Sequence, residues 1–367
     1  GRRGAPWAAL LACGAALGVT APATAQIRDE VRVYGFDTSK PPGSLMSVLR
    51  YNRKLQLVGA TGTAGGGSLG QETAMSIDGQ GRMWISYDPL YTTQLMRIDA
   101  GGTLLPSAWL SDNPIKVAID VDGRAYAITR IGLTAPGPAY GVDANGNVLW
   151  SNSAGPSLYN YGYPQQLAVT AGGEVWIGDA TIPEGAVKTV PLLVNVDKLD
   201  GHVLQTLALP ASSVGAHAGI CRLSSSPDGS LWSYVCAGSE RLLTKTEGTQ
   251  ILMSFPVNGG YNISTYAMHV DAQDRPHIVS FWTDGLGSKV YRYNPATPQA
   301  PDATFQFGGT ITGWEFGPSG EDAFAIIGPE SAPLTRRLER LNLVTGAKSS
   351  IPLNPAWSSG ALAYGDV

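Results

Sequence analysis

The chain has 367 residues, a formal net charge of −4, 43% hydrophobic residues and only 15% charged residues. This composition excludes a disordered chain, because it supplies ample apolar material for a core. It also excludes charge-driven nucleic-acid binding, which needs clustered Lys and Arg side chains to contact phosphates. Gly (46) and Pro (25) are frequent, as expected where many tight turns join short strands.

The first 25 residues contain the three parts of a secretory signal peptide in the usual order. Arg2 and Arg3 form a positive start, an apolar stretch runs from Ala5 to Val19, and Ala23-Thr24-Ala25 matches an A-x-A cleavage site. We therefore expect a signal peptide at residues 1–25 and a single domain at 26–367. The protein is expected to be secreted, periplasmic or on the cell surface.

Two alternatives for the N-terminal segment remain. One is a buried N-terminal helix. The other is a lipoprotein anchored at Cys13, because Leu10-Leu11-Ala12-Cys13 is similar to a lipobox. No later apolar run is long enough to predict a transmembrane segment.

A repeated hairpin follows along the chain. Each copy has a short apolar strand, a tight turn that contains Gly in most copies, and a second strand with an aromatic residue early in it. The aromatic or equivalent positions are Trp84, Tyr126, Trp176, Trp232, His277 and Phe324. Steps of 42 to 56 residues between these positions are typical of β-propeller blades with four short strands each.

A second class of hairpin lies between these copies. In residues 95–105, 140–150, 193–204 and 338–351, a turn containing Gly joins two alternating strands. Each blade is therefore expected to contain strands a and b in the first hairpin and strands c and d in the second.

The two ends of the chain predict the blade count. Glu30 to Gly59 matches strands b, c and d of a blade, and Ala361–Val367 matches the missing strand a. Six complete blades and this split blade predict an all-β, seven-bladed β-propeller of four-stranded antiparallel blades. Closure by three N-terminal strands and one C-terminal strand removes unpaired strand edges. An open ring of six blades is the alternative.

Cys221 and Cys236 flank the turn signal Pro227-Asp228-Gly229-Ser230. With Asp228-Gly229 at the centre of the turn, the two cysteines lie directly opposite each other, with Cα atoms about 4.5–5.5 Å apart. We expect a disulfide, which an oxidising compartment outside the cytoplasm favours. The alternative is a pair of reduced, buried thiols.

The unit Asp-x-x-Gly-x-x-Trp, best seen around Trp84, Trp176 and Trp232, resembles the blades of NHL and streptogramin-lyase-like propellers. It is also similar to blades of the gluconolactonase-like superfamily. The resemblance covers residues 30–367 and implies the fold. It implies no single activity, because these propellers include lyases, lactonases, and peptide-binding and RNA-binding modules.

In propellers of this kind the d–a and b–c loops meet at the mouth of the central channel. His217 lies in such a loop and is the expected base of a lyase or lactonase. Glu72 and Asp179 are the expected ligands of one divalent cation, Ca or Mg, that polarises a substrate carbonyl. The alternatives are no cofactor, and a hydrogen-bonded loop histidine without a ligand.

The remaining histidines have other expected places. His202 falls in a c–d turn, outside the channel. His269 and His277 fall in an a–b hairpin, where a packing role is expected, with the channel as the alternative position for His269.

Aromatic residues gather in the predicted mouth loops. Tyr159, Tyr161 and Tyr163 form a dense group, and Tyr87, Arg130 and Trp282 lie in other loops of the same face. Exposed tyrosines favour binding of proteins, peptides or glycans, and packing between blades is the alternative. The first expectation is thus a non-enzymatic binding protein. The second is a metal-assisted lyase or lactonase with His217 as base.

Overall fold

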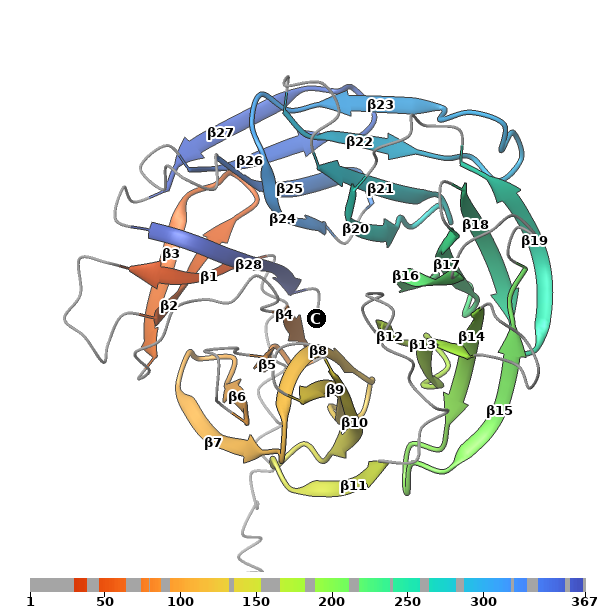
Figure 1. Cartoon of the computed structure of the whole chain (residues 1–367). Helices are drawn as coiled ribbons and strands as arrows, with labels where there is room; N and C mark the ends of the chain where they lie inside the picture. The colour runs from red at the N-terminus through yellow and green to blue at the C-terminus, as the bar shows by residue number, and fades with distance from the viewer. Residues whose placement is uncertain are drawn as a thin grey trace, which may run out of the picture.

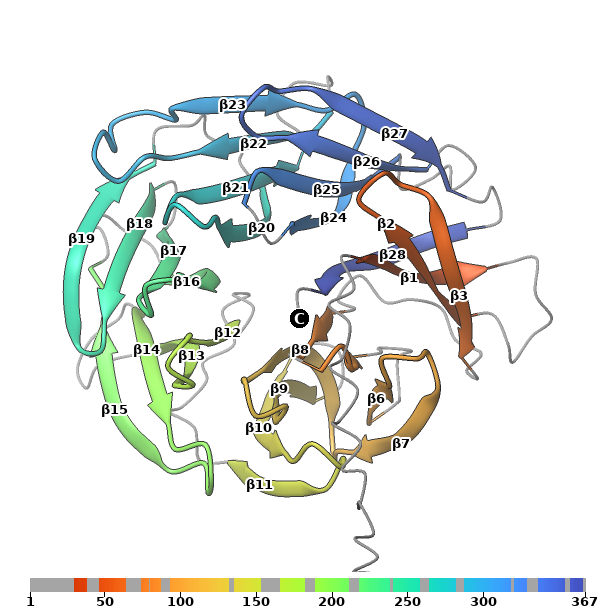
Figure 2. The ribbon, with the colours of Figure 1, turned by 180° about the vertical axis from the view of Figure 1, so that it is seen from behind.

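The structure is a computed structural model, and it describes residues 30–37, 46–63, 74–78, 80–86, 93–131, 135–152, 166–181, 189–210, 218–237, 240–257, 264–281, 287–317, 320–328, 336–353 and 357–365. These residues form seven four-stranded antiparallel sheets in a ring (Figures 1 and 2). The seven-bladed β-propeller is confirmed, and the six-bladed alternative is wrong. Within these ranges, no helix is long and apolar enough to cross a membrane.

The strands of each blade are numbered in chain order, and strand a is the innermost. Blade 1 contains β28 (Trp357–Gly365), β1 (Glu30–Asp37), β2 (Met46–Asn52) and β3 (Leu57–Thr63), and blade 2 contains β4 (Ala74–Ile77), β5 (Met83–Ser86), β6 (Gln94–Ile98) and β7 (Leu104–Trp109). Blade 3 contains β8 (Asn113–Ile119), β9 (Ala125–Ile131), β10 (Ala135–Val142) and β11 (Val148–Asn152), and blade 4 contains β12 (Gln166–Val169), β13 (Val175–Thr181), β14 (Val190–Val196) and β15 (Val203–Ala208). Blade 5 contains β16 (Ala218–Ser225), β17 (Leu231–Ala237), β18 (Glu240–Glu247) and β19 (Gln250–Pro256), and blade 6 contains β20 (Ser264–Val270), β21 (Pro276–Phe281), β22 (Lys289–Arg292) and β23 (Ala303–Gln306). Blade 7 contains β24 (Ile311–Phe316), β25 (Asp322–Ile327), β26 (Arg337–Asn342) and β27 (Lys348–Pro352).

Blade 1 closes the ring. The C-terminal strand β28 pairs antiparallel with β1, with Val33 opposite Leu362 and Tyr34 opposite Ala361. In Figure 1 the blue β28 lies against the red β1 and points toward the centre of the ring. The predicted split blade is therefore confirmed.

The core lies between neighbouring blades. Trp84, Trp176 and Trp232, each early in a strand b, are fully buried. Trp84 of blade 2 packs with Ala125 and Ala127 of blade 3. The repeated aromatic residue therefore joins one blade to the next, and burying so large a side chain favours the closed ring.

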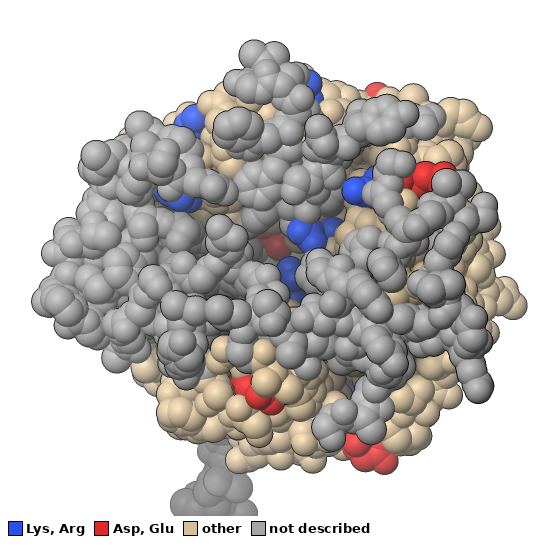
Figure 3. All heavy atoms as spheres, viewed as in Figure 1, with Lys and Arg blue, Asp and Glu red and all other residues tan. Residues whose placement is uncertain are grey.

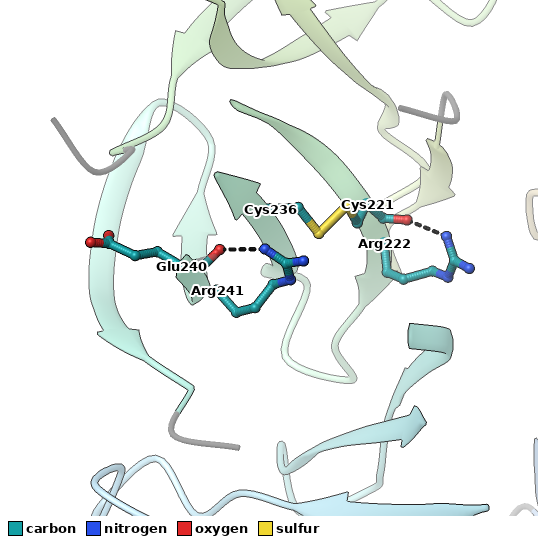
Figure 4. The surroundings of a disulfide bond; sticks show 5 residues. All are labelled: Cys221, Arg222, Cys236, Glu240 and Arg241. Atoms are coloured by element: carbon teal, nitrogen blue, oxygen red, sulfur yellow. Dashed lines mark hydrogen bonds between the residues drawn. A yellow bond between two sulfur atoms is a disulfide. The ribbon is translucent and has the colours of Figure 1, made fainter. Parts of the chain in front are cut away.

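Cys221 and Cys236 form the predicted disulfide, with Cα atoms 5.9 Å apart (Figure 4). A disulfide fits the oxidising conditions outside the cytoplasm. The predicted register is wrong, because Cys236 lies opposite Gly219 and the strands shift between Ile220 and Arg222. The turn runs from Ser226 to Ser230 instead of centring on Asp228-Gly229, and Cys221, at the shift of register, occupies a β-bulge.

Candidate active site in the central channel

The innermost strands surround the axis of the ring. Side chains on a strand alternate between its two sides, and here one side packs on the preceding blade. Val117 and Ile119 of β8, for example, pack against the cluster around Trp84 of blade 2. The other side faces the following blade, as Ala168 of β12 does in packing with Ile220 and Leu223 of blade 5. Its partly exposed side chains border the channel. Figure 3 shows a hollow at the centre of the ring where basic and acidic side chains lie together.

His269 and Glu315 form a pair across two of these strands. His269 comes from β20 of blade 6 and Glu315 from β24 of blade 7, and His269 Nδ1 lies 3.8 Å from Glu315 Oε1. Their side chains are 30% and 26% exposed. The His269 ring also contacts the edge of Phe316, with ring centres 5.9 Å apart. An imidazole and a carboxyl group thus share one partly enclosed space.

The surroundings of the pair shift the pKa values of both groups, in opposite directions. Burial, together with the positive charge of Lys116, lowers the pKa of His269 to about 4. Burial raises the pKa of Glu315 to about 7, although the Phe316 N–H, which donates to Oε1 at 3.0 Å, opposes this rise. Near neutral pH the imidazole is therefore an unprotonated base, beside a carboxyl group that still holds its proton in part of the molecules.

His277 lies next to this pair and packs on the same phenylalanine. It is fully buried, its Nε2 lies 3.0 Å from Asp271 Oδ2, and its ring packs on Phe316 at 4.7 Å between ring centres. The packing role predicted for His277 is confirmed, and His202 lies exposed in a c–d turn as expected. His269, by contrast, takes the channel position that was its alternative.

The sequence does contain a signal for the pair. His269 and Glu315 each lie two residues before the first residue of an a–b turn. The corresponding residues of blades 2 to 5 are Ser76, Ala118, Ala168 and Ser224. Aligning the repeats on their turns would have singled out blades 6 and 7 as the two with titratable groups at this level of the channel.

Asp179 is a second buried acid, near the end of β13 in blade 4. It is only 8% exposed, and its Oδ1 accepts the Ala180 N–H at 2.7 Å. Its Oδ2 has no hydrogen-bond partner in the described part of the chain, and burial raises its pKa to about 7. Such an oxygen can hold a proton or bind a cation. Its expected co-ligand Glu72 and the expected base His217 lie outside the described residues, and the divalent cation stays a prediction.

The residues predicted to bind a partner are also largely outside the described ranges. Tyr87, Tyr159, Tyr161, Tyr163 and Trp282 all fall there. Arg130 belongs to strand β9, opposite Asn113 and Pro136, and is not in a loop as expected. The binding function built on these residues stays a prediction.

A three-residue group that could hold a metal lies away from the channel. Ligand atoms of Asp197, Asp200 and His202 lie within 4.8 Å of one another on the turn between β14 and β15. Asp200 and His202 are exposed. Because exposed acidic groups are common without an ion, the group does not by itself define a site.

No protein-family model matches this sequence, and no curated protein matches it. Solved structures match its fold. A virginiamycin B lyase from Staphylococcus aureus is 13% identical, over 78% of this chain and 86% of the other, with a TM-score of 0.51. A streptogramin B lyase is 11% identical, over 82% and 96%, with a TM-score of 0.53. A putative 6-phosphogluconolactonase from Bacteroides fragilis is 10% identical, over 94% and 100%, with a TM-score of 0.60. At these identities the likeness establishes the β-propeller fold alone.

Proposed function

We propose that this protein is an enzyme of the lyase or lactonase type, with His269 as general base and Glu315 as general acid. The observation that carries the proposal is the pair itself. A neutral imidazole and a protonatable carboxyl lie 3.8 Å apart in the channel, and burial raises the pKa of the carboxyl to about 7. General acids and bases work best when their pKa values lie near the working pH.

His269 and Glu315 have the same roles, base and acid, in both reaction types. In a lyase reaction, His269 removes a proton from the carbon next to a carbonyl, a C=C bond forms, and the C–O bond to the leaving oxygen breaks. In a lactonase reaction, His269 removes a proton from water as its oxygen attacks the ring carbonyl, and the ring C–O bond breaks. In both, Glu315 gives its proton to the departing oxygen.

The comparisons support this choice of chemistry. Propellers of similar fold include lyases and a putative lactonase. One of the similar structures is a virginiamycin B lyase made catalytically inactive by replacing a histidine with alanine, with quinupristin bound. A histidine base in the present channel agrees with that dependence on histidine.

A panel of γ- and δ-lactones, together with cyclic esters whose ring oxygen lies on the carbon β to a second carbonyl, tests the proposal, with product masses read by mass spectrometry. Ring opening by water adds the mass of one water molecule, whereas elimination leaves the mass unchanged. We expect His269→Ala and Glu315→Gln each to lower kcat/KM by about a hundredfold or more. In the wild type, kcat/KM should rise above about pH 4, as His269 becomes a free base, and fall above about pH 7, as Glu315 ionises.

The matched control is His217→Ala, which removes the histidine first expected to be the base. It should leave turnover unchanged. Loss of turnover in His217→Ala with retention in His269→Ala would move the base to the loop face and overturn the proposal. If kcat/KM of the Glu315→Gln variant still fell above about pH 7, Glu315 would not be the general acid.

A further inference from the structure

Phe316 of blade 7 packs across two histidines of blade 6. His269 on β20 and His277 on β21 lie directly opposite each other in their hairpin. The ring of Phe316, on β24, meets both imidazoles nearly at right angles, with ring centres 5.9 Å from His269 and 4.7 Å from His277. A single aromatic side chain from blade 7 therefore contacts the histidine pair of blade 6.

The same residue also contacts the acid of the His269–Glu315 pair. The Phe316 N–H donates to Glu315 Oε1 at 3.0 Å, and this oxygen lies 3.8 Å from His269 Nδ1. The ring of Phe316 is itself packed against Trp314, which is nearly buried, with ring centres 5.9 Å apart. Phe316 thus contacts the base through its side chain and the acid through its main chain.

Among blades 2 to 7, only blade 7 has an aromatic residue at this position. Phe316 directly precedes its a–b turn, and the equivalent residues of blades 2 to 6 are Ile77, Ile119, Val169, Ser225 and Val270. The four aliphatic residues of this set also pack on the preceding blade. An aliphatic side chain is therefore enough for packing between blades, and the ring in blade 7 points to a further role.

We propose that Phe316 is a positioning residue, which fixes the distance and the angle between the His269 imidazole and the Glu315 carboxyl group. A displacement of about 1 Å in such a pair can lower a reaction rate about a hundredfold. The ring also occupies space beside the imidazole that water could fill, and so contributes to the burial that lowers the pKa of His269. The effect of Phe316 on turnover rests on the proposed function, but its control of the geometry does not.

NMR titration of the histidine rings in Phe316→Leu tests the proposal without a substrate. Leucine keeps the N–H that donates to Glu315 and removes only the ring. The signal of His269 is identified by its absence in His269→Ala. We expect the pKa of His269 to rise by about one pH unit, because water reaches the imidazole. On a lactone that the wild type opens, kcat should fall about tenfold while KM changes less than about twofold. Phe316→Tyr, which keeps the ring, should behave like the wild type in both measurements.

The matched control is Phe305→Leu. Phe305 is partly buried like Phe316 and packs on the same cluster between blades 6 and 7, but it lies on the outer strand β23. Both variants keep the titratable groups that act on His269, namely Lys116, His277 and Glu315. The control should therefore leave the pKa of His269 and kcat unchanged.

Equal pKa values of His269 in Phe316→Leu and Phe305→Leu would overturn the positioning role, as would an equal fall of kcat in both variants. A raised pKa of His269 in a protein that opens no lactone, or that loses no turnover, would support the role of Phe316 in the geometry and would overturn the catalytic role of the pair. If leucine prevents folding, Phe316→Met gives the same comparison, because methionine fills irregular gaps.

Discussion

At the residue scale, His277 occupies a position where the other complete blades have an aromatic residue. In blade 3, Tyr126 at this position donates its hydroxyl to Asp120 of the turn at 2.8 Å. His277 repeats the arrangement by donating from Nε2 to Asp271, which leaves Nδ1 buried without a partner among the described residues. Burial alone would raise the pKa of Asp271, but hydrogen bonds from His277 and Arg275 outweigh it and hold this pKa at about 2. Burial lowers the pKa of His277 and favours the neutral imidazole, because a proton on Nδ1 would have no hydrogen-bond acceptor among the described residues.

His277→Phe is expected to change how stability depends on pH. Burial lowers the pKa of His277 below its unfolded value, so the unfolded state binds the extra proton first and the wild type loses stability as pH falls below about 6.5. At pH 8 the variant should be about 1 kcal/mol less stable, because it loses the hydrogen bond to Asp271. This deficit should shrink or reverse at pH 5. Urea unfolding at both pH values measures it, with the exposed His202→Ala as control. An equal deficit at both pH values would mean that folding leaves the pKa of His277 unchanged.

At the scale of elements, cations on strand c fasten one blade to the next. Lys245 on β18 is nearly buried, and its Nζ lies 2.6 Å from Asp228 Oδ2 of its own blade and 2.5 Å from Asp274 Oδ2 of blade 6. Asp274 also accepts the Trp232 Nε1–H at 2.8 Å. It adopts a left-handed φ of 59°, where the other a–b turns have glycine. The cost of this conformation is offset by contacts that only a carboxylate can make.

Lys245→Met should lower the free energy of unfolding by about 1–3 kcal/mol, because it leaves two carboxylates side by side without their shared cation. The matched control is Lys198→Met. Its side chain is 40% exposed and its Nζ lies 3.6 Å from Asp122 Oδ2 of blade 3, so its loss should cost less than about 0.5 kcal/mol. Urea unfolding of both variants gives the comparison. If both variants lost the same free energy of unfolding, burial would add nothing to the strength of the Lys245 contact between blades 5 and 6.

The hairpins could be predicted from the sequence because their turn residues and aromatic positions recur in six copies. The ends of the strands were harder to predict. Arg130 was expected in a mouth loop, but β9 continues to Ile131 and β10 begins at Ala135. The candidate site was missed for a different reason. Within its own hairpin His269 is indistinguishable from a packing residue, and its closeness to Glu315 arises only when blades 6 and 7 stand side by side.

At the scale of the whole molecule, closure of the ring shapes the channel. Strand β28 pairs with β1 and also contacts β24 of blade 7 and β4 of blade 2. It is thus the one inner strand that holds the two ends of the chain and the two flanking blades together. Since Glu315 lies on β24, closure also helps to set the position of the proposed acid.

Deleting residues 357–367 removes this strand and should abolish cooperative folding. The deletion exposes the edge of β1 and opens the inner wall between blades 7 and 2, a loss of more than about 4 kcal/mol that few domains of ordinary stability tolerate. We expect aggregation in size-exclusion chromatography, or a broad urea transition at lower denaturant concentration. Deleting only residues 366–367, which follow β28, should leave the transition unchanged. A truncated protein that unfolds at the wild-type midpoint would show that packing between blades is enough to stabilise the ring. The C-terminal strand would then matter for the shape of the channel more than for the stability of the fold.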